Sequence, residues 1–481
     1  MIKFIFTLFT LLGKISLSVA QTLSVTGELL VFEGSKASNR VWVKTSQTNN
    51  KSFIPIVPPP GDEFVFTTGM YIDANYEDGS FPYQITTYNI AMPDKKIDTV
   101  ISSITYIVNI CDSVNTLTTD VVKRKWSSFA NHVRTCSWGV NTFPRDKNIV
   151  LGPFNVSCDA FNTNTCDESA LYDLIYTLDT KAQNAPYKLN PFDFKRRILL
   201  LPLIPSCQWT GMGTIGCGNS CMIWLNGEIS ALSTSTLFHE FGHTQGLLHS
   251  ASGSDEYGDF TCPMGQARSE YACLNPVHNL KLGWSRIARD ITSPVDFMDI
   301  RLDCISCSRN NVIRFNPSIN NGELLYITFI KDFRYSALQD ESVKNKLIFH
   351  VANTGSSAKV KHLPFLINVM GVGESFTYFN ANVTFVSING TTALIRLYGG
   401  GSQCGDFTCT ETANENVETC PFDCCQKNVA CGDGICDSWA GENCLTCPDD
   451  CKASGVACCG DGNTGCPEEV CGTSCAVKCS A

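Results

Sequence analysis

The sequence predicts an α+β domain between β-rich segments, followed by a disulfide-rich tail of repeats. In the middle of the chain, apolar β-prone runs alternate with amphipathic helical patterns, which is typical of an α+β domain. Towards the C-terminal end, 16 cysteines lie between Cys404 and Cys479, where apolar residues are too few to form a core without disulfides. The length of 481 residues and the hydrophobic content of 43% allow roughly two to four domains.

Residues 1–20 have the pattern of a secretory signal peptide. Lys3 precedes an apolar run, and small residues end at Ala20, which predicts cleavage before Gln21. A retained membrane anchor is the competing interpretation, but the run is shorter than the ~20 residues that a membrane-spanning helix needs. We therefore expect a soluble protein that is secreted and extracellular.

The cysteine content fits an extracellular location, because a density of 27 cysteines persists as disulfides only in oxidising compartments. Eleven of them lie between Cys111 and Cys307, so pairing within this region leaves one thiol over. That thiol could be buried, pair with a second chain or ligate a metal. The chain also has four Asn-x-Ser/Thr sites that would accept glycans, at Asn50, Asn155, Asn382 and Asn389.

The formal net charge of −10 belongs to the tail. From Cys404 onward there are 13 acidic and 3 basic residues, whereas the rest of the chain holds 33 of each. An acidic tail disfavours nucleic acid and anionic membranes as partners, so neither nucleic-acid binding nor stable membrane insertion is expected. Calcium is a second candidate ion, at the Asp-Gly turns of the tail, although a plain turn explains that pattern more often.

Residues 21–95 are predicted to form an N-terminal β-rich segment. Short β-prone runs at 29–32, 40–43 and 64–67 alternate with turn-rich pieces, and the segment contains no cysteine. It precedes the central domain as an inhibitory propeptide would, but a stable N-terminal β domain would have the same sequence pattern.

The central domain is expected at 96–289. Its predicted elements are a buried strand at 99–110, a helix at 117–133, strands at 149–154, 198–204 and 222–225, and a helix that begins at the Ser/Thr run 233–236. Because the run 198–204 is entirely apolar, we expect it at the centre of the sheet. Cys207, Cys217 and Cys221 cluster nearby, where disulfides are favoured over a second metal site.

The last predicted helix carries a metal-binding pattern, because the chain reads His-Glu-Phe-Gly-His-Thr-Gln-Gly-Leu-Leu-His there. His239 and His243 lie four positions apart, on one helical face, at the separation that two imidazoles need to bind one zinc ion. Glu240 follows the first histidine and can reach water on the metal. Gly246 can take the left-handed conformation that ends a helix, which lets His249 approach the same ion.

Further segments downstream resemble a known family. A Tyr-Gly-Asp run at 257–259 and Met264 precede a predicted helix at 275–284 that ends in Leu-Gly-Trp. The long zinc motif with a methionine 15 residues after its last histidine resembles the metzincin clan. With the segments around it, the chain resembles the gametolysin family of secreted zinc metalloendopeptidases over roughly residues 97–400.

The resemblance implies a role for each matching residue. His239, His243 and His249 would be the zinc ligands, Glu240 the general base and acid, and Met264 the methionine that forms an apolar floor under the metal. It implies a metzincin-like catalytic domain that hydrolyses peptide bonds of extracellular, matrix or cell-wall proteins and glycoproteins with a zinc-activated water.

Two further observations concern the residues around the zinc motif. Matrixins share the His-Glu-Phe-Gly-His core, but no Pro-Arg-Cys-Gly latency segment precedes it here, which favours the gametolysin interpretation. The nearest carboxylates that could orient the histidines are Asp255 and Asp259.

The C-terminal part is again β-rich. A sandwich-like module is expected at 290–400, with strands at 312–315, 324–330, 346–351, 376–378, 383–388 and 392–398. The acidic tail at 401–481 follows a Gly-rich linker and repeats three times, from Cys404, Cys431 and Cys459. Its Asp-Gly and Cys-x-x-Cys patterns indicate units held by disulfides.

Two functions from different classes remain after these observations. The first is a secreted zinc endopeptidase whose tail aids attachment. The second is a catalytically silent adhesion or surface-recognition protein that uses the Cys-rich tail. The intact Glu240 and the three intact histidines disfavour the second function, because a site that had lost its chemistry would be free to lose them.

Overall fold

The structure is a computed structural model. It describes residues 22–32, 40–44, 53–59, 66, 68, 70–77, 82–91, 99–218, 220–227, 231–291, 298–316, 323–353, 363–379 and 381–399. The predicted signal peptide, the Cys-rich tail with its linker and most of the predicted strand at 64–67 lie outside these residues. The chain forms two compact units. Among the described helices, none combines the length and the apolar character needed to cross a membrane.

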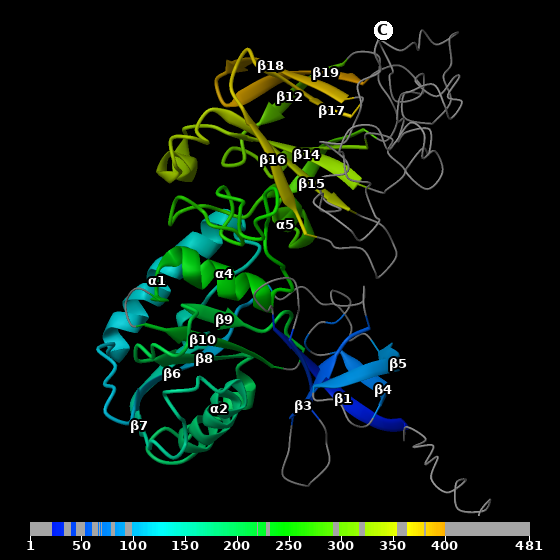
Figure 1. Cartoon of the computed structure of the whole chain (residues 1–481). Coiled ribbons are helices and arrows are strands. Elements are labelled where there is room, and N and C mark those ends of the chain that lie inside the picture. Colours follow the sequence, from blue (N-terminus) through cyan, green and yellow to red (C-terminus); the bar gives the residue numbers. More distant parts are fainter. Residues whose placement is uncertain are drawn as a thin grey trace, which may run out of the picture. The chain divides into compact units, whose positions relative to one another are not determined.

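The first unit begins with a closed five-stranded barrel in the order β1-β2-β3-β5-β4 (Figure 1). Its strands are β1 Thr22–Phe32, β2 Arg40–Lys44, β3 Phe53–Val57, β4 Tyr71–Glu77 and β5 Tyr83–Ala91. Alternate residues such as Val41 and Val43 are buried inside it, as the two-residue period of a strand requires. The β-rich character predicted for this segment is confirmed, whereas β3, β4 and β5 were not predicted.

The end of β1 contributes to the core of the neighbouring domain. Phe32 is buried, and its ring centroid lies 5.5 Å from that of Tyr172 and 5.6 Å from that of Trp224. The backbone N–H of Ile215 also donates to the carbonyl of Val31, at 2.8 Å. The barrel and the next domain therefore share one continuous apolar core.

That domain is built on a mixed sheet in the order β7-β6-β8-β10-β9. The strands are β6 Ser103–Ile110, β7 Asn148–Val156, β8 Arg196–Leu201, β9 Gly211–Gly213 and β10 Cys221–Asn226. The strands β7, β6, β8 and β10 are parallel, with Ile223 opposite Ile198, and β9 is an antiparallel edge strand. Every residue of β8 is buried, which confirms its predicted central position.

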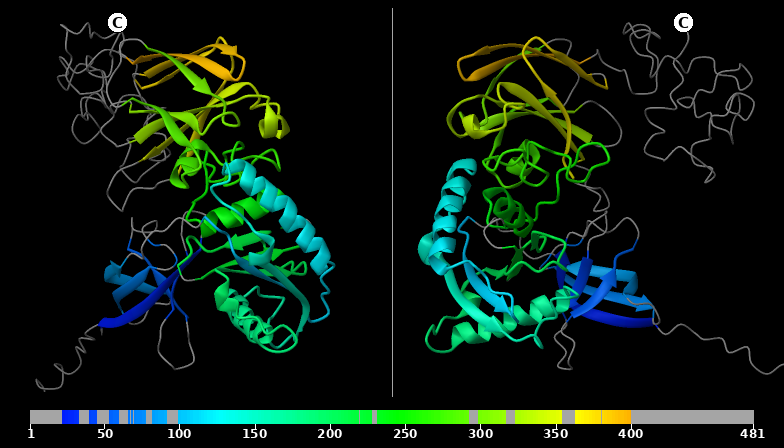
Figure 2. Two further views of the ribbon diagram at one scale, coloured as in Figure 1. Left: turned by 180° about the vertical axis from the view of Figure 1, so that it is seen from behind. Right: turned by 60° about the vertical axis from the view of Figure 1, so that its left-hand side comes forward.

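Helices cover both faces of this sheet. The helix α2 (Glu168–Gln183) lies on one face, and α1 (Thr119–Cys136) and α4 (Thr234–Thr244) lie on the other (Figures 1 and 2). Neighbouring residues of β6 point to opposite sides: Tyr106 donates to Asp179 of α2, whereas Thr105 accepts from Trp126 of α1. The predicted helix at 117–133 is thus confirmed as α1.

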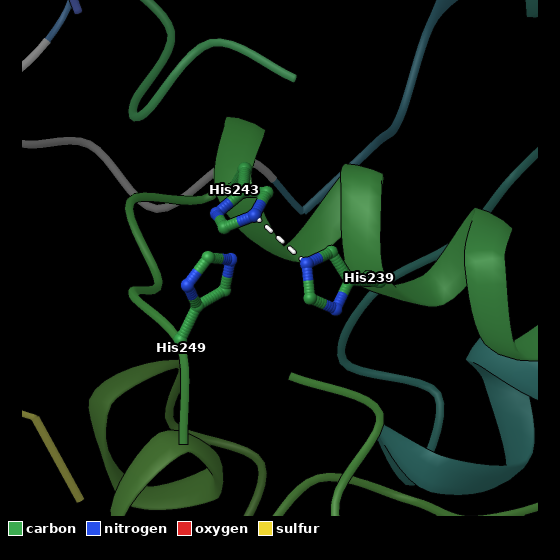
Figure 3. Close-up of side chains that lie close together, drawn as sticks. All are labelled: His239, His243 and His249. Carbon is green, nitrogen blue, oxygen red and sulfur yellow. Dashed lines mark hydrogen bonds between the residues drawn. The ribbon is translucent and has the colours of Figure 1, made fainter. Parts of the chain in front are cut away.

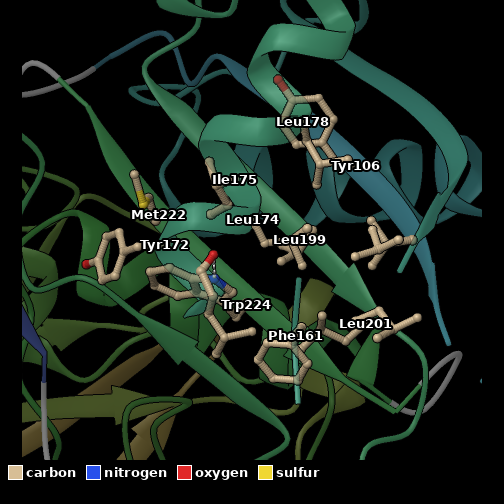
Figure 4. Packing of buried hydrophobic residues seen from close by; sticks show 14 of the residues in the cluster. Tyr106, Phe161, Tyr172, Leu174, Ile175, Leu178, Leu199, Leu201, Met222 and Trp224 are labelled. Carbon is tan, nitrogen blue, oxygen red and sulfur yellow. Dashed lines mark hydrogen bonds between the residues drawn. The ribbon is translucent and has the colours of Figure 1, made fainter. Parts of the chain in front are cut away.

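The helix α2 was not predicted, although its apolar residues recur at helical spacing. Leu171, Leu174, Ile175 and Leu178 are all buried against the sheet. Figure 4 shows three of them packed with Tyr106, Leu199 and Trp224 in the core.

The second unit contains the helix α5 (Pro276–Lys281) and two antiparallel-rich sheets, in the orders β11-β13-β14-β15-β16 and β12-β19-β18-β17. The strands are β11 Arg286–Ile291, β12 Met298–Asp303, β13 Asn310–Phe315, β14 Glu323–Ile330, β15 Lys346–Asn353, β16 Phe365–Met370, β17 Ser375–Tyr378, β18 Ala381–Asn389 and β19 Thr392–Gly399. One core joins both sheets, including Phe349 from the first and Phe385 from the second, which confirms the predicted sandwich.

Three strands of this unit were not predicted from the sequence. The strand β11 was not predicted, because only its last residue is buried and no apolar pattern marks it. The strands β12 and β16 were also missed. The helix α5 is shorter than the predicted 275–284, since Asn275 caps it and the chain leaves the helix at Leu282.

Five disulfides link ten of the cysteines in the described residues. The pairs are Cys111–Cys158, Cys136–Cys273, Cys166–Cys207, Cys217–Cys221 and Cys304–Cys307. The cluster of three cysteines therefore forms disulfides, as predicted. The thiol left over among these residues is that of Cys262. The side chain of Cys262 is buried, and this burial raises the pKa of its thiol.

Candidate metal centre

The helix α4 presents the first two histidines. Ser233 precedes it and accepts the N–H of Thr236 at 3.0 Å, which confirms the Ser/Thr run as the helix start. The opposite side of the helix is buried, and the ring of Phe241 lies 4.8 Å from that of Phe129 in α1. Capping and packing thus fix the helix that positions His239 and His243.

The third histidine follows a turn at Gly246. This glycine has a φ of +80°, in the left-handed region that side chains other than glycine rarely adopt. Its N–H donates to the carbonyl of His243 at 2.7 Å, which ends the helix. The predicted role of Gly246 is confirmed, since the chain leaves the helix axis three residues before His249.

The three histidines lie together (Figure 3). Each offers a ring nitrogen, and these atoms all lie within 4.8 Å of one another. The Nε2 atoms of His239 and His243 are 3.0 Å apart. Among the described residues this is the cluster that could hold a metal ion. The Asp-Gly turns of the tail, where calcium was the second candidate ion, lie outside the described residues.

The hydrogen bonds of two rings fit a zinc ion. Nδ1 of His243 donates to the carbonyl of Leu247 at 3.0 Å, and Nδ1 of His249 donates to the Glu256 carboxylate at 2.6 Å. Donation from Nδ1 places the lone pair of a neutral ring on Nε2. Neutral imidazoles held in this way are the usual ligands of zinc.

Glu240 lies against the edge strand β9. Its side chain is buried, with 4% of its surface exposed. A Cβ atom added to Gly211 would lie 2.7 Å from Cδ of Glu240 and closer still to Oε1, and one added to Gly213 would lie 2.9 Å from the Glu240 carbonyl oxygen. The missing side chains of β9 therefore leave the space that the Glu240 carboxylate occupies.

Met264 is fully buried, and its carbonyl accepts the N–H of Ser250 at 2.9 Å. Ser250 follows His249 directly, so this bond joins the segment around Met264 to the segment that carries the third histidine. The neighbouring Gly265 has no room for a side chain, because an added Cβ would lie 2.8 Å from the Ser250 carbonyl oxygen.

Comparison with known proteins agrees with this geometry. The profile of the gametolysin peptidase M11 family matches residues 101–383, which is more than half of the chain. The chain belongs to the gametolysin peptidase family. A stretch of 96 residues is 30% identical to autolysin of Chlamydomonas reinhardtii; it makes up 19% of this chain and only 15% of that protein. The family is one of metallopeptidases, and its matched region contains the three histidines.

The carboxylate that orients a histidine of this gametolysin-family chain is Glu256, which the sequence did not indicate. Asp255 accepts the N–H of Tyr257 instead, and Asp259 accepts the hydroxyl of Ser250. In these two contacts the candidate aspartates hold Tyr257 and Ser250, and neither contact is with a histidine ring. The turn between Ser252 and Asp255, closed by two backbone hydrogen bonds, brings the next residue back to His249. The Tyr257 ring also packs on His249, at 4.0 Å between centroids.

We expect Glu256→Ala to weaken zinc binding by about 10- to 100-fold, because His249 loses the acceptor that fixes its ring and tautomer. The zinc dissociation constant, measured by competition with a chromogenic chelator, checks this. Glu270→Gln removes a similar charge from an exposed position and serves as the control. An unchanged dissociation constant in Glu256→Ala would show that the hydrogen bond does not position the ligand.

Proposed function

We propose that this protein is a secreted zinc-dependent metalloendopeptidase. The observation that carries the proposal is the set of three histidine nitrogens within 4.8 Å of one another, next to a buried glutamate. His239, His243 and His249 would hold the zinc. Membership of a metallopeptidase family supports the same chemistry.

The proposed mechanism assigns the proton transfers to Glu240. When bound, zinc supplies a Lewis acid that lowers the pKa of water to about 7 and polarises a carbonyl. Glu240 directly follows His239, so its carboxylate is placed to accept the proton of the attacking water and pass it to the leaving amine. The glycines of β9 support this role, since they keep side-chain atoms away from the carboxylate. Met264 would form the apolar floor beneath the metal.

The domain assignment is part of the proposal. The mixed sheet, with an antiparallel edge strand beside the zinc helix, supports a metzincin-like catalytic domain at 96–289. The burial of Phe32 in the shared core supports a stable N-terminal domain at 21–95 over a propeptide that is removed. The sandwich supports a separate β module at 290–400, followed by the repeat tail at 401–481.

The proposed substrates are extracellular, matrix or cell-wall proteins and glycoproteins. The predicted signal peptide and the five disulfides of the described residues support an oxidising, extracellular location. The glycosylation sites at Asn155 and Asn389 lie on exposed residues, as glycan attachment requires.

Hydrolysis of casein by the purified full-length protein tests the proposal. We expect activity that a zinc chelator such as 1,10-phenanthroline removes and that added zinc restores. The alternative function, adhesion or surface recognition through the tail, predicts binding to matrix or cell-wall material with no hydrolysis in either condition. That result would contradict the peptidase.

A further inference from the structure

The segment that follows the third histidine is tied to the β-sandwich. Ala251 forms a parallel bridge with Phe365 of β16, donating its N–H to Pro364 and accepting that of Leu366 at 3.0 and 2.8 Å. The hydroxyl of Ser252 donates to the Leu366 carbonyl at 2.9 Å. The backbone beside His249 is therefore held by the C-terminal module.

A buried carboxylate makes a second connection between this segment and the β-sandwich. Asp259 is fully buried, and its Oδ2 accepts the Ser250 hydroxyl at 2.6 Å and Nε2–H of His350 at 2.9 Å. His350 lies in β15 and is also fully buried. On the other oxygen, Oδ1 accepts the N–H and the hydroxyl of Thr261, at 2.8 and 2.6 Å. A hydrogen-bonded chain thus runs from the sandwich strand to the residue after His249.

The hydrogen-bond donors around Asp259 stabilise its ionised carboxylate. Burial alone would raise the pKa of Asp259, but the adjacent His350 and the hydroxyls of Ser250 and Thr261 outweigh burial, so the pKa lies below its usual value. A buried charge with one donor removed is costly, because the remaining hydrogen bonds must rearrange to satisfy it. Loss of either end of the chain of hydrogen bonds is therefore expected to shift Ser250, and His249 with it.

We propose that Asp259 and His350 are positioning residues for the third zinc ligand, so that the β-sandwich is an integral part of the metal centre. The inference rests on the proposed zinc site. Neither residue touches the metal in this proposal; both act through Ser250. The module at 290–400 would then be required for tight zinc binding and not only for attachment or stability.

The test compares His350→Phe with Phe349→Leu in the full-length protein. His350→Phe keeps an aromatic ring but removes the donor to Asp259, whereas Phe349 is the buried neighbour that faces the sandwich core. We expect His350→Phe to weaken zinc binding by about 10- to 100-fold and to change the visible absorption spectrum of the cobalt-loaded protein. Phe349→Leu should lower the thermal midpoint of the zinc-free protein while leaving the zinc dissociation constant and the cobalt spectrum unchanged.

A second pair of variants keeps the result decisive if one of them folds poorly. Asp259→Asn should weaken zinc binding to a similar degree, and the double variant with His350→Phe should be no weaker than Asp259→Asn alone, because both residues act through one carboxylate. Equal zinc affinity in His350→Phe and Phe349→Leu, or additive losses in the double variant, would overturn the inference. A wild-type protein that binds no zinc would instead contradict the proposed function itself.

Discussion

Replacing Glu240 with alanine should lower peptide hydrolysis by about 100- to 10,000-fold while zinc remains bound. The three proposed ligands are imidazoles, so removal of the carboxylate leaves the nitrogen atoms that would bind the metal in place. What is lost is the group that accepts and returns the proton. Turnover of a fluorogenic peptide and zinc content by elemental analysis, measured on the same preparation, check both parts of this expectation.

Two further variants separate the proton transfer from a change of shape. Glu240→Gln keeps the size of the side chain but cannot take up a proton, so it should be as inactive as Glu240→Ala. The exposed Glu270→Gln should keep full activity. Substantial hydrolysis by Glu240→Gln would mean that another group is the general base.

Replacing Gly211 with alanine should lower kcat/KM by about 100-fold without loss of zinc, because a small displacement of a catalytic group has an effect of this size. The added methyl group would overlap the Glu240 carboxylate, with its carbon only 2.7 Å from Cδ. The backbone of β9 pairs with the buried β10, so the edge strand is held and the carboxylate must move. Steady-state kinetics and zinc content of the variant check this.

Thr210→Ala is the matched control, because it lies in the adjacent position, is exposed and adds no atom. The variant Gly213→Ala should behave like Gly211→Ala, since its added Cβ meets the Glu240 backbone carbonyl and Oε2. Wild-type kinetics in both glycine variants would show that the space beside Glu240 accommodates a side chain. The space beside Glu240 would then have no role in positioning it.

The parts of the fold that the sequence predicts correctly are set by local chemistry. The helix α4 begins after the capping residue Ser233 and ends at Thr244, shortly before the left-handed Gly246, because both end signals act within a few residues. The central strand β8 is evident from its apolar run. The 11 cysteines between Cys111 and Cys307 are an odd number, which predicts one unpaired thiol. That this thiol belongs to Cys262 depends on which cysteines the fold brings together.

The residues that the sequence does not reveal act over long distances. His350 lies 91 positions from Asp259, and their contact depends on how the strands of the sandwich pair. Glu256 lies close to His249 in sequence, but the turn that directs its carboxylate to the ring could not be distinguished from one that directs Asp255 there. Similarly, Gly211 is an ordinary turn-region glycine until the edge strand is placed against Glu240.

The zinc content of the wild-type protein and of His249→Ala tests the central claim most directly. Elemental analysis after removal of loosely bound metal should give about one zinc per chain in the wild type and a large loss in the variant, with peptide hydrolysis lost in parallel. His132→Ala, which removes a histidine outside the metal cluster, should keep its zinc. A wild-type protein without zinc, or a His249→Ala variant with full zinc and activity, would contradict the three-histidine peptidase site.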